Sequence, residues 1–166
     1  LGPEMKSTGE VLGVAKTFRE ALMKGLIGAG FNMKQKGAVV ISVRDSDKQE
    51  AIKIAERFES LGFDLYATRG TANVLNRHMV ATNSVGNIDE PSPNIIDLID
   101  SGKIDYIIST SVKGRKPKLG SVRIRRRAVE HAVPCLTSID TASALLRCLE
   151  SKNRLEHCEM VDINQV

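Results

Sequence analysis

From residue 38 onward, short apolar segments alternate with amphipathic helical patterns, and this alternation restricts the fold more than any other feature. The helical pattern is clearest from Ala51 to Phe58, where apolar residues recur three, four and seven positions on. Strands that alternate with helices build a parallel sheet with helices on both faces. The sequence therefore predicts an α/β fold, a Rossmann-like doubly wound sandwich with a five-stranded, mainly parallel sheet. The predicted strands are 38–43, 63–67, 78–82, 104–108 and 133–136.

Two local signals mark the starts of predicted helices. Ser46 is followed three residues later by Gln49, a spacing typical of a capping box, so we expect Ser46 to begin a helix. Ser92 precedes Pro93, which is favoured at the first position of a helix, so we expect another helix to begin there. Residues 83–92, just before it, are predicted to form a loop.

The chain divides into three predicted regions. We expect residues 1–37 to be the end of a preceding region and a linker, 38–152 to form one compact domain, and 153–166 to be a polar tail. No run of about 18 apolar residues occurs, so no membrane partner is predicted. Because the chain lacks an initiator Met and a signal-peptide pattern, we expect a fragment of a longer, cytoplasmic protein.

The cysteines do not form a pattern of ligands or disulfides. Cys135, Cys148 and Cys158 are odd in number, and no CxxC pair occurs. We therefore expect reduced thiols, with Cys135 on a strand and Cys148 in a helix, and we predict no metal site.

The basic excess is concentrated in one segment. The chain has 24 Lys and Arg residues against 20 Asp and Glu, and residues 113–127 hold eight basic residues and no acidic one. Such a segment suits an anion, a nucleic acid, an acidic partner or simply a solvated surface. Aromatic residues make up only 4% of the chain, which leaves few side chains for stacking on bases, so nucleic acid is not the expected partner.

Polar residues follow the predicted strands at the edge where open α/β sheets bind ligands. Hydroxyls, amides, a Gly and a Lys of this kind suit an oxyanion such as phosphate. Gly70 lets the backbone approach an anion closely, and the helix start beside it supplies free N–H groups. An ordinary strand-to-helix turn, with Thr71 only capping the helix, stays as the alternative. The candidate residues are Ser42, Lys48, Thr68, Gly70, Thr71, Asn87, Ser109, Thr110 and Ser111.

Standard catalytic patterns are not found. Neither GxxxxGK[ST] nor GxGxxG follows the first strand, so both common nucleotide fingerprints are missing. His78, His131 and His157 are scattered and accompany no obvious nucleophile. Asp45 and Asp47 fit the first turn of a helix, where acidic residues are favourable without any catalytic role. No catalytic residue is therefore predicted.

Several segments resemble one enzyme family. LGPEMKSTGEVLG, residues 1–13, is similar to the closing part of the second ATP-grasp half of the carbamoyl phosphate synthetase large subunit. The segments SVRDSDK (42–48), ATRGTA (67–72), YIISTS (106–111) and IRRRA (124–128) resemble its C-terminal allosteric domain, which is of the methylglyoxal-synthase-like type. The segments follow the family's order along essentially the whole chain.

This resemblance implies a regulatory domain over 38–152, with the end of the ATP-grasp region in 1–37. Such a domain binds nucleotide effectors such as UMP or IMP and has no catalysis or cofactor of its own. The implied parent is a glutamine-hydrolysing ligase that uses ATP with Mg or Mn and serves pyrimidine and arginine biosynthesis. Implied partners are the rest of the large subunit and, through it, the glutaminase small subunit. Implied effector contacts are Ser42, Lys48, Thr68, Thr71 and Thr110.

The sequence departs from the family pattern at three positions. Asn87 stands where the family has a phosphate-binding Lys, Ser109 replaces an Asn, and Cys135 replaces a Tyr linked to ornithine activation. Phosphate binding would then depend more on Lys48, and ornithine activation is not carried over. Additional anion contacts are predicted for Lys113, Arg115 and Lys116, which follow the fourth predicted strand directly. These cations favour the hypothesis of a more highly charged effector, such as phosphoribosyl pyrophosphate.

Methylglyoxal synthases carry a catalytic Asp in a Gly-rich segment that the resemblance places after the fourth strand. The corresponding stretch here, SVKGRKPKLGS, has no carboxylate to abstract a proton. The resemblance therefore favours binding over catalysis. A small sugar-phosphate lyase of this type and a basic nucleic-acid binder stay as alternatives.

Overall fold

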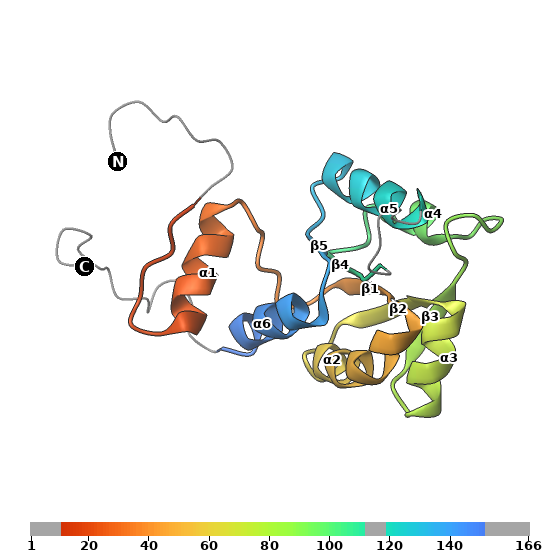
Figure 1. Cartoon of the computed structure of the whole chain (residues 1–166), viewed down its shortest axis with the longest axis horizontal. Helices are drawn as coiled ribbons and strands as arrows, with labels where there is room; N and C mark the ends of the chain where they lie inside the picture. Colours follow the sequence, from red (N-terminus) through yellow and green to blue (C-terminus); the bar gives the residue numbers. More distant parts are fainter. Residues whose placement is uncertain (1–10, 112–118, 152–166) are drawn as a thin grey trace. The chain divides into compact units, whose positions relative to one another are not determined.

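A computed structural model describes residues 11–111 and 119–151 of the chain (Figure 1). The predicted anion contacts Lys113, Arg115 and Lys116 lie outside the described residues, as does the predicted tail 153–166. The described residues form two compact units, one of 34–146 and one of 11–33 with 147–151. The three predicted regions stay a prediction.

Helices and strands alternate along the described chain, as the sequence predicts. The elements are α1 (Phe18–Gly28), β1 (Ala38–Ser42), the short 3-10 helix η1 (Asp45–Asp47), α2 (Lys48–Ser60), β2 (Asp64–Thr68), α3 (Arg69–Arg77), β3 (Thr82–Val85), α4 (Ile95–Asp100), β4 (Tyr106–Ser109), α5 (Leu119–Glu130), β5 (Cys135–Leu136) and α6 (Ile139–Leu149).

The five described strands form one sheet in the order β3-β2-β1-β4-β5, and every neighbouring pair is parallel. The predicted α/β doubly wound fold is confirmed, and the sheet is entirely parallel where the prediction allowed a mixture. The chain builds outward from β1 through β2 to β3, and then crosses back so that β4 lies on the other side of β1. The β1–β4 pair is therefore the topological switch point, where ligands bind in such folds.

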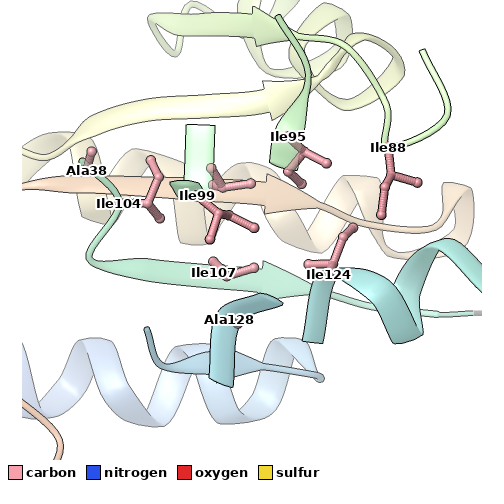
Figure 2. Packing of buried hydrophobic residues seen from close by; sticks show 9 residues of the cluster. Ala38, Ile88, Ile95, Ile99, Ile104, Ile107, Ile124 and Ala128 are labelled. Atoms are coloured by element: carbon pink, nitrogen blue, oxygen red, sulfur yellow. The ribbon is translucent and has the colours of Figure 1, made fainter. Parts of the chain in front are cut away.

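Helices cover both faces of the sheet (Figure 1). On one face α4 and α5 enclose a cluster in which Val40 of β1 and Ile107 of β4 are fully buried (Figure 2). On the other face Phe58 of α2 contacts the rings of Phe63 and Tyr106, with the Phe58–Phe63 ring centres 5.2 Å apart. Burial raises the pKa of the Tyr106 hydroxyl to about 12. The cluster in Figure 2 comprises Ala38, Val40, Ile88, Ile95, Ile99, Ile104, Ile107, Ile124 and Ala128.

The start of β1 is fixed by Asp105, which precedes β4. Its Oδ2 accepts a hydrogen bond from the Ala38 N–H at 2.9 Å, and its Oδ1 forms an ion pair with Lys34. The Tyr106 hydroxyl donates to the Lys34 carbonyl at 3.2 Å. One carboxylate thus ties together the beginnings of the two strands that form the switch point.

The third strand was predicted over 78–82, and this is wrong. Helix α3 continues to Arg77, the chain turns at Met79 with φ +62°, and β3 occupies Thr82–Val85. Among the described strands it pairs only with β2, and two of its four side chains are exposed. An edge strand with polar residues lacks the apolar pattern from which the buried strands were predicted.

Both predicted helix starts are also corrected. Ser46 does not cap a helix, because its hydroxyl donates to Asp47 Oδ1 within η1, and α2 begins only at Lys48. Pro93 is not the first helical residue, because Asn94 caps α4 instead. Asn94 Oδ1 accepts from the Asp97 N–H, and the Asp97 carboxylate accepts from the Asn94 N–H, which completes a capping box.

The two described cysteines lie where they were expected. Cys135 is on β5 and Cys148 is in α6, and both are free thiols. Burial raises the pKa of the Cys135 thiol to about 11. Neither thiol is therefore activated as a nucleophile at neutral pH.

Candidate functional site

A pocket of about 400 Å³ opens at the carboxyl ends of β1, β2 and β4. It lies at the switch point, with Ser42 at the end of β1 and Ser109 at the end of β4 paired in register. Thr71, Ser109 and Thr110, the buried polar residues among those described, all line it. The pocket brings together every described residue predicted for the site: Ser42, Lys48, Thr68, Gly70, Thr71, Asn87, Ser109, Thr110 and Ser111.

The first turn of α3 forms one wall of the pocket. Thr68 ends β2 and precedes the helix, and its hydroxyl donates to the Thr71 hydroxyl over 3.5 Å. Thr71 is the third helical residue rather than the cap, and its side chain is 1% exposed. No capping hydrogen bond from a described side chain occupies the first N–H groups of α3. These N–H groups are therefore available to an anion.

The Lys48 ammonium lies against this turn. A Cβ built on Gly70 would be 3.0 Å from Lys48 Nζ, so a side chain at this position would push the ammonium away by a few tenths of an ångström. Lys48 Nζ also forms an ion pair with Asp45 Oδ1 at 2.6 Å. Lys48, Thr68 and Thr71 thus face one cavity, although they come from two different strand–helix units.

Arg44 and Thr110 connect the ends of β1 and β4. The Thr110 N–H donates to the Ser42 carbonyl at 3.2 Å, and the Thr110 hydroxyl accepts from the Arg44 N–H at 3.1 Å. The Arg44 guanidinium donates to Asp47 Oδ1 at 2.7 Å and approaches the Ser111 carbonyl at 3.5 Å. This network fixes the two strand ends that form the floor of the pocket.

Sequence reasoning did not assign the carboxylates of the pocket to the site. Asp45, Asp89 and Glu90 all line it. Glu90 Oε2 accepts from the Asn87 N–H at 2.9 Å and lies 3.4 Å from Arg69 Nε. The loop after β3 was recognised as a site element through Asn87, but the sequence does not show which of its side chains turn inward.

Asp89 and Asn87 each interact with a residue close by. Asp89 Oδ1 is 3.0 Å from a guanidinium nitrogen of Arg123 on α5. Asn87 Oδ1 accepts from the Ile88 N–H at 2.8 Å, so this side chain shapes its loop. Ile88 and Ile124 form the apolar wall of the pocket and also belong to the cluster of Figure 2.

Asp47→Asn is expected to lower stability by about 1 kcal/mol at pH 7, because the charged carboxylate holds Arg44. Burial acts to raise the pKa of Asp47, but hydrogen bonds from Arg44, Thr110 and Ser46 outweigh it and keep the pKa below 3.8. The carboxylate therefore stabilises the fold above about pH 4, and this contribution is lost as the pH falls through its lowered pKa. Urea unfolding of wild type and Asp47→Asn at pH 7 and near pH 2 measures the difference in their stability. A difference that stays constant between the two pH values would contradict the assignment.

The described residues contain neither a cluster of metal ligands nor a membrane-spanning helix. Among them, no group of three His, Cys, Asp or Glu side chains could hold a metal ion. No helix within 11–111 or 119–151 is both long and apolar enough to cross a membrane.

Together, the doubly wound sheet and the donor-lined pocket at its switch point define an α/β domain with a candidate site for a small anion. The family model of the MGS-like domain matches residues 50–137, slightly more than half of the chain. The chain belongs to the MGS-like domain family. Among solved structures, methylglyoxal synthase from Elizabethkingia anophelis is similar in fold, with a TM-score of 0.56 at 16% sequence identity. The match covers 71% of this chain and 80% of that one.

Proposed function

We propose that this chain is the effector-binding regulatory domain of a carbamoyl phosphate synthetase large subunit. The pocket holds a phosphorylated effector such as UMP, IMP or phosphoribosyl pyrophosphate, and performs no reaction on it. The observation that carries the proposal is the Lys48 ammonium placed beside the open first turn of α3, 3.0 Å from the position of a Cβ on Gly70. The resemblance of residues 1–13 to the end of an ATP-grasp region supports the particular parent enzyme.

The donors suit a phosphate group bound at the start of α3. Free N–H groups of the first turn and the partial positive charge of the helix end attract an anion. The Thr68 and Thr71 hydroxyls add neutral donors, and Lys48 adds a full charge. Ser109 and Thr110, at the end of β4, would meet the part of the effector that extends along the switch point.

The pairing of the carboxylates supports binding rather than catalysis. Asp45 is paired with Lys48, Asp89 with Arg123, and Glu90 with Arg69. A general base must accept a proton from the substrate, and an ion-paired carboxylate is a weaker base than a free one. In the parent enzyme, ATP and Mg or Mn would bind in the catalytic domains, and the glutaminase subunit would be reached through them.

A methylglyoxal-synthase-type lyase is the second candidate. Glu90 favours it, because this carboxylate lines the same pocket as the phosphate donors and could face the carbon next to a carbonyl. In that reaction the carboxylate would remove a proton from a small sugar phosphate, and the phosphate would leave.

Two assays on the whole 166-residue chain decide between the candidates. Calorimetry with UMP, IMP, phosphoribosyl pyrophosphate and ornithine should show saturable binding of a phosphorylated ligand. Incubation with dihydroxyacetone phosphate should release no phosphate above the uncatalysed background. Phosphate release that disappears in Glu90→Gln would establish the lyase instead. Binding of none of the phosphorylated compounds, with no turnover, would contradict both candidates.

A further inference from the structure

The pocket contains the counter-ions of its own cations. Each of the three cations among the described lining residues has a carboxylate within ion-pair distance. Arg44 pairs with Asp47 at 2.7 Å, and Lys48 pairs with Asp45 at 2.6 Å. Arg69 pairs with Glu90 at 3.4 Å. An arriving phosphate therefore meets cations that are already compensated, and it must compete with the protein's own anions.

The three carboxylates differ in how far they are exposed to water. The Asp47 side chain is 13% exposed, and the Glu90 side chain is 37% exposed. The Asp45 side chain, by contrast, is 95% exposed, so its carboxylate is hydrated even while it contacts Lys48.

The ion pair of Lys48 and Asp45 is asymmetric. The Lys48 side chain is only 20% exposed, and its ammonium is confined between Asp45 and the Gly70 turn. If the Asp45 side chain moves away from Lys48, its carboxylate stays hydrated. The less exposed Lys48 ammonium then needs a new partner inside the pocket. The phosphate of a ligand at the α3 turn would lie beside the same ammonium. Releasing Asp45 is therefore the least costly way to free a cation for the ligand.

We propose that Asp45 competes with the ligand for Lys48: it pairs with the Lys48 ammonium and releases it when the phosphate of the ligand binds. The inference rests on the proposed function and adds a residue that sets affinity and charge selectivity. A singly charged anion would only replace one carboxylate by another of equal charge. A phosphate monoester brings about two negative charges near neutral pH, so it gains more from Lys48 than Asp45 loses.

The test compares Asp45→Asn with wild type by calorimetry, using UMP and inorganic phosphate as probes. Asp45→Asn should bind both probes about three- to tenfold more tightly, because it removes the competitor and its repulsion of the phosphate. Asp89→Asn is the matched control: it removes the same charge from the same pocket, but its partner is Arg123. We expect the control to change affinity by less than about twofold, because the cation that it releases, Arg123, does not line the pocket.

A double variant separates competition for Lys48 from a general change in charge. In a Lys48→Ala background, Asp45→Asn should lose most of its gain, since there is no ammonium left to release. An equal gain with and without Lys48, or a gain no larger than that of Asp89→Asn, would overturn the inference. Melting temperatures within about 2 °C of wild type verify that the variants fold, as expected for substitutions at an exposed site.

The outcomes also distinguish this inference from the proposed function. If wild type binds UMP and Lys48→Ala weakens it, but Asp45→Asn is unchanged, the inference fails and the proposed function stands. If only Asp45→Asn binds measurably, both are supported. If neither wild type nor Asp45→Asn binds any phosphorylated probe, both fail.

Discussion

Lys48→Ala is expected to weaken binding of a phosphorylated effector about ten- to a hundredfold, or about 1.5–3 kcal/mol. The half-buried ammonium lies beside the open turn of α3, where it would donate a charge-assisted hydrogen bond to the phosphate. Alanine removes that donor and leaves the backbone N–H groups of the turn in place. Calorimetric titration of both proteins with UMP and phosphoribosyl pyrophosphate measures the change.

Lys53→Ala provides the matched control, because Lys53 is on the same helix, is exposed and does not line the pocket. Lys53→Ala removes the same charge from the chain but not from the pocket. The affinity of this variant for the effector should therefore remain within about twofold of wild type. Equal affinities for wild type and Lys48→Ala would remove Lys48 from the site. Equal losses in both variants would show that only the overall charge matters.

Gly37→Ala is expected to lower the free energy of unfolding by about 2–4 kcal/mol. Gly37 has a φ of +150°, which L side chains rarely adopt, and an added Cβ would lie 1.8 Å from Asp105 Oδ2. The carboxylate would have to move, and its hydrogen bond to the Ala38 N–H would be lost. The beginnings of β1 and β4 would then separate. Urea unfolding followed by circular dichroism measures the loss.

Gly62→Ala separates backbone strain from the clash with Asp105. Gly62 also has a positive φ, +83°, but an added Cβ there would meet nothing within 4 Å. We expect it to cost about 1 kcal/mol, the penalty of the backbone conformation alone. If Gly37→Ala costs no more than Gly62→Ala, the Asp105 carboxylate does not fix the start of β1.

The sequence predicts the fold well where strands are buried on both faces. Strands β1 and β4 contain the apolar runs 38–41 and 106–108, and the burial of these residues is complete or nearly so. Prediction fails for β3, because an edge strand with exposed Asn83 and Ser84 gives no apolar signal. It also fails at Pro93, because the competing capping box of Asn94 depends on how the preceding loop enters the helix.

The candidate site was predictable to the extent that it follows from topology. In a parallel sheet the carboxyl ends of neighbouring strands share one edge, so Ser42, Thr68 and Ser109 had to lie close together. The pairing of Lys48 with Asp45 was not predictable, because it depends on η1 replacing the expected helical turn. The inward position of Glu90 was not predictable either, because a loop sequence does not encode the direction of its side chains.

A titration of the ¹⁵N-labelled chain with UMP, followed by two-dimensional NMR, tests the central claim most directly. That claim is that a phosphate group binds at the start of α3 and stays intact. We predict saturable shifts of the Gly70 and Thr71 amide signals with UMP and none with uridine, while the ³¹P signal of the ligand shows no release of phosphate. Equal shifts with uridine, shifts confined to residues outside the pocket, or no shifts with any phosphorylated ligand would contradict it.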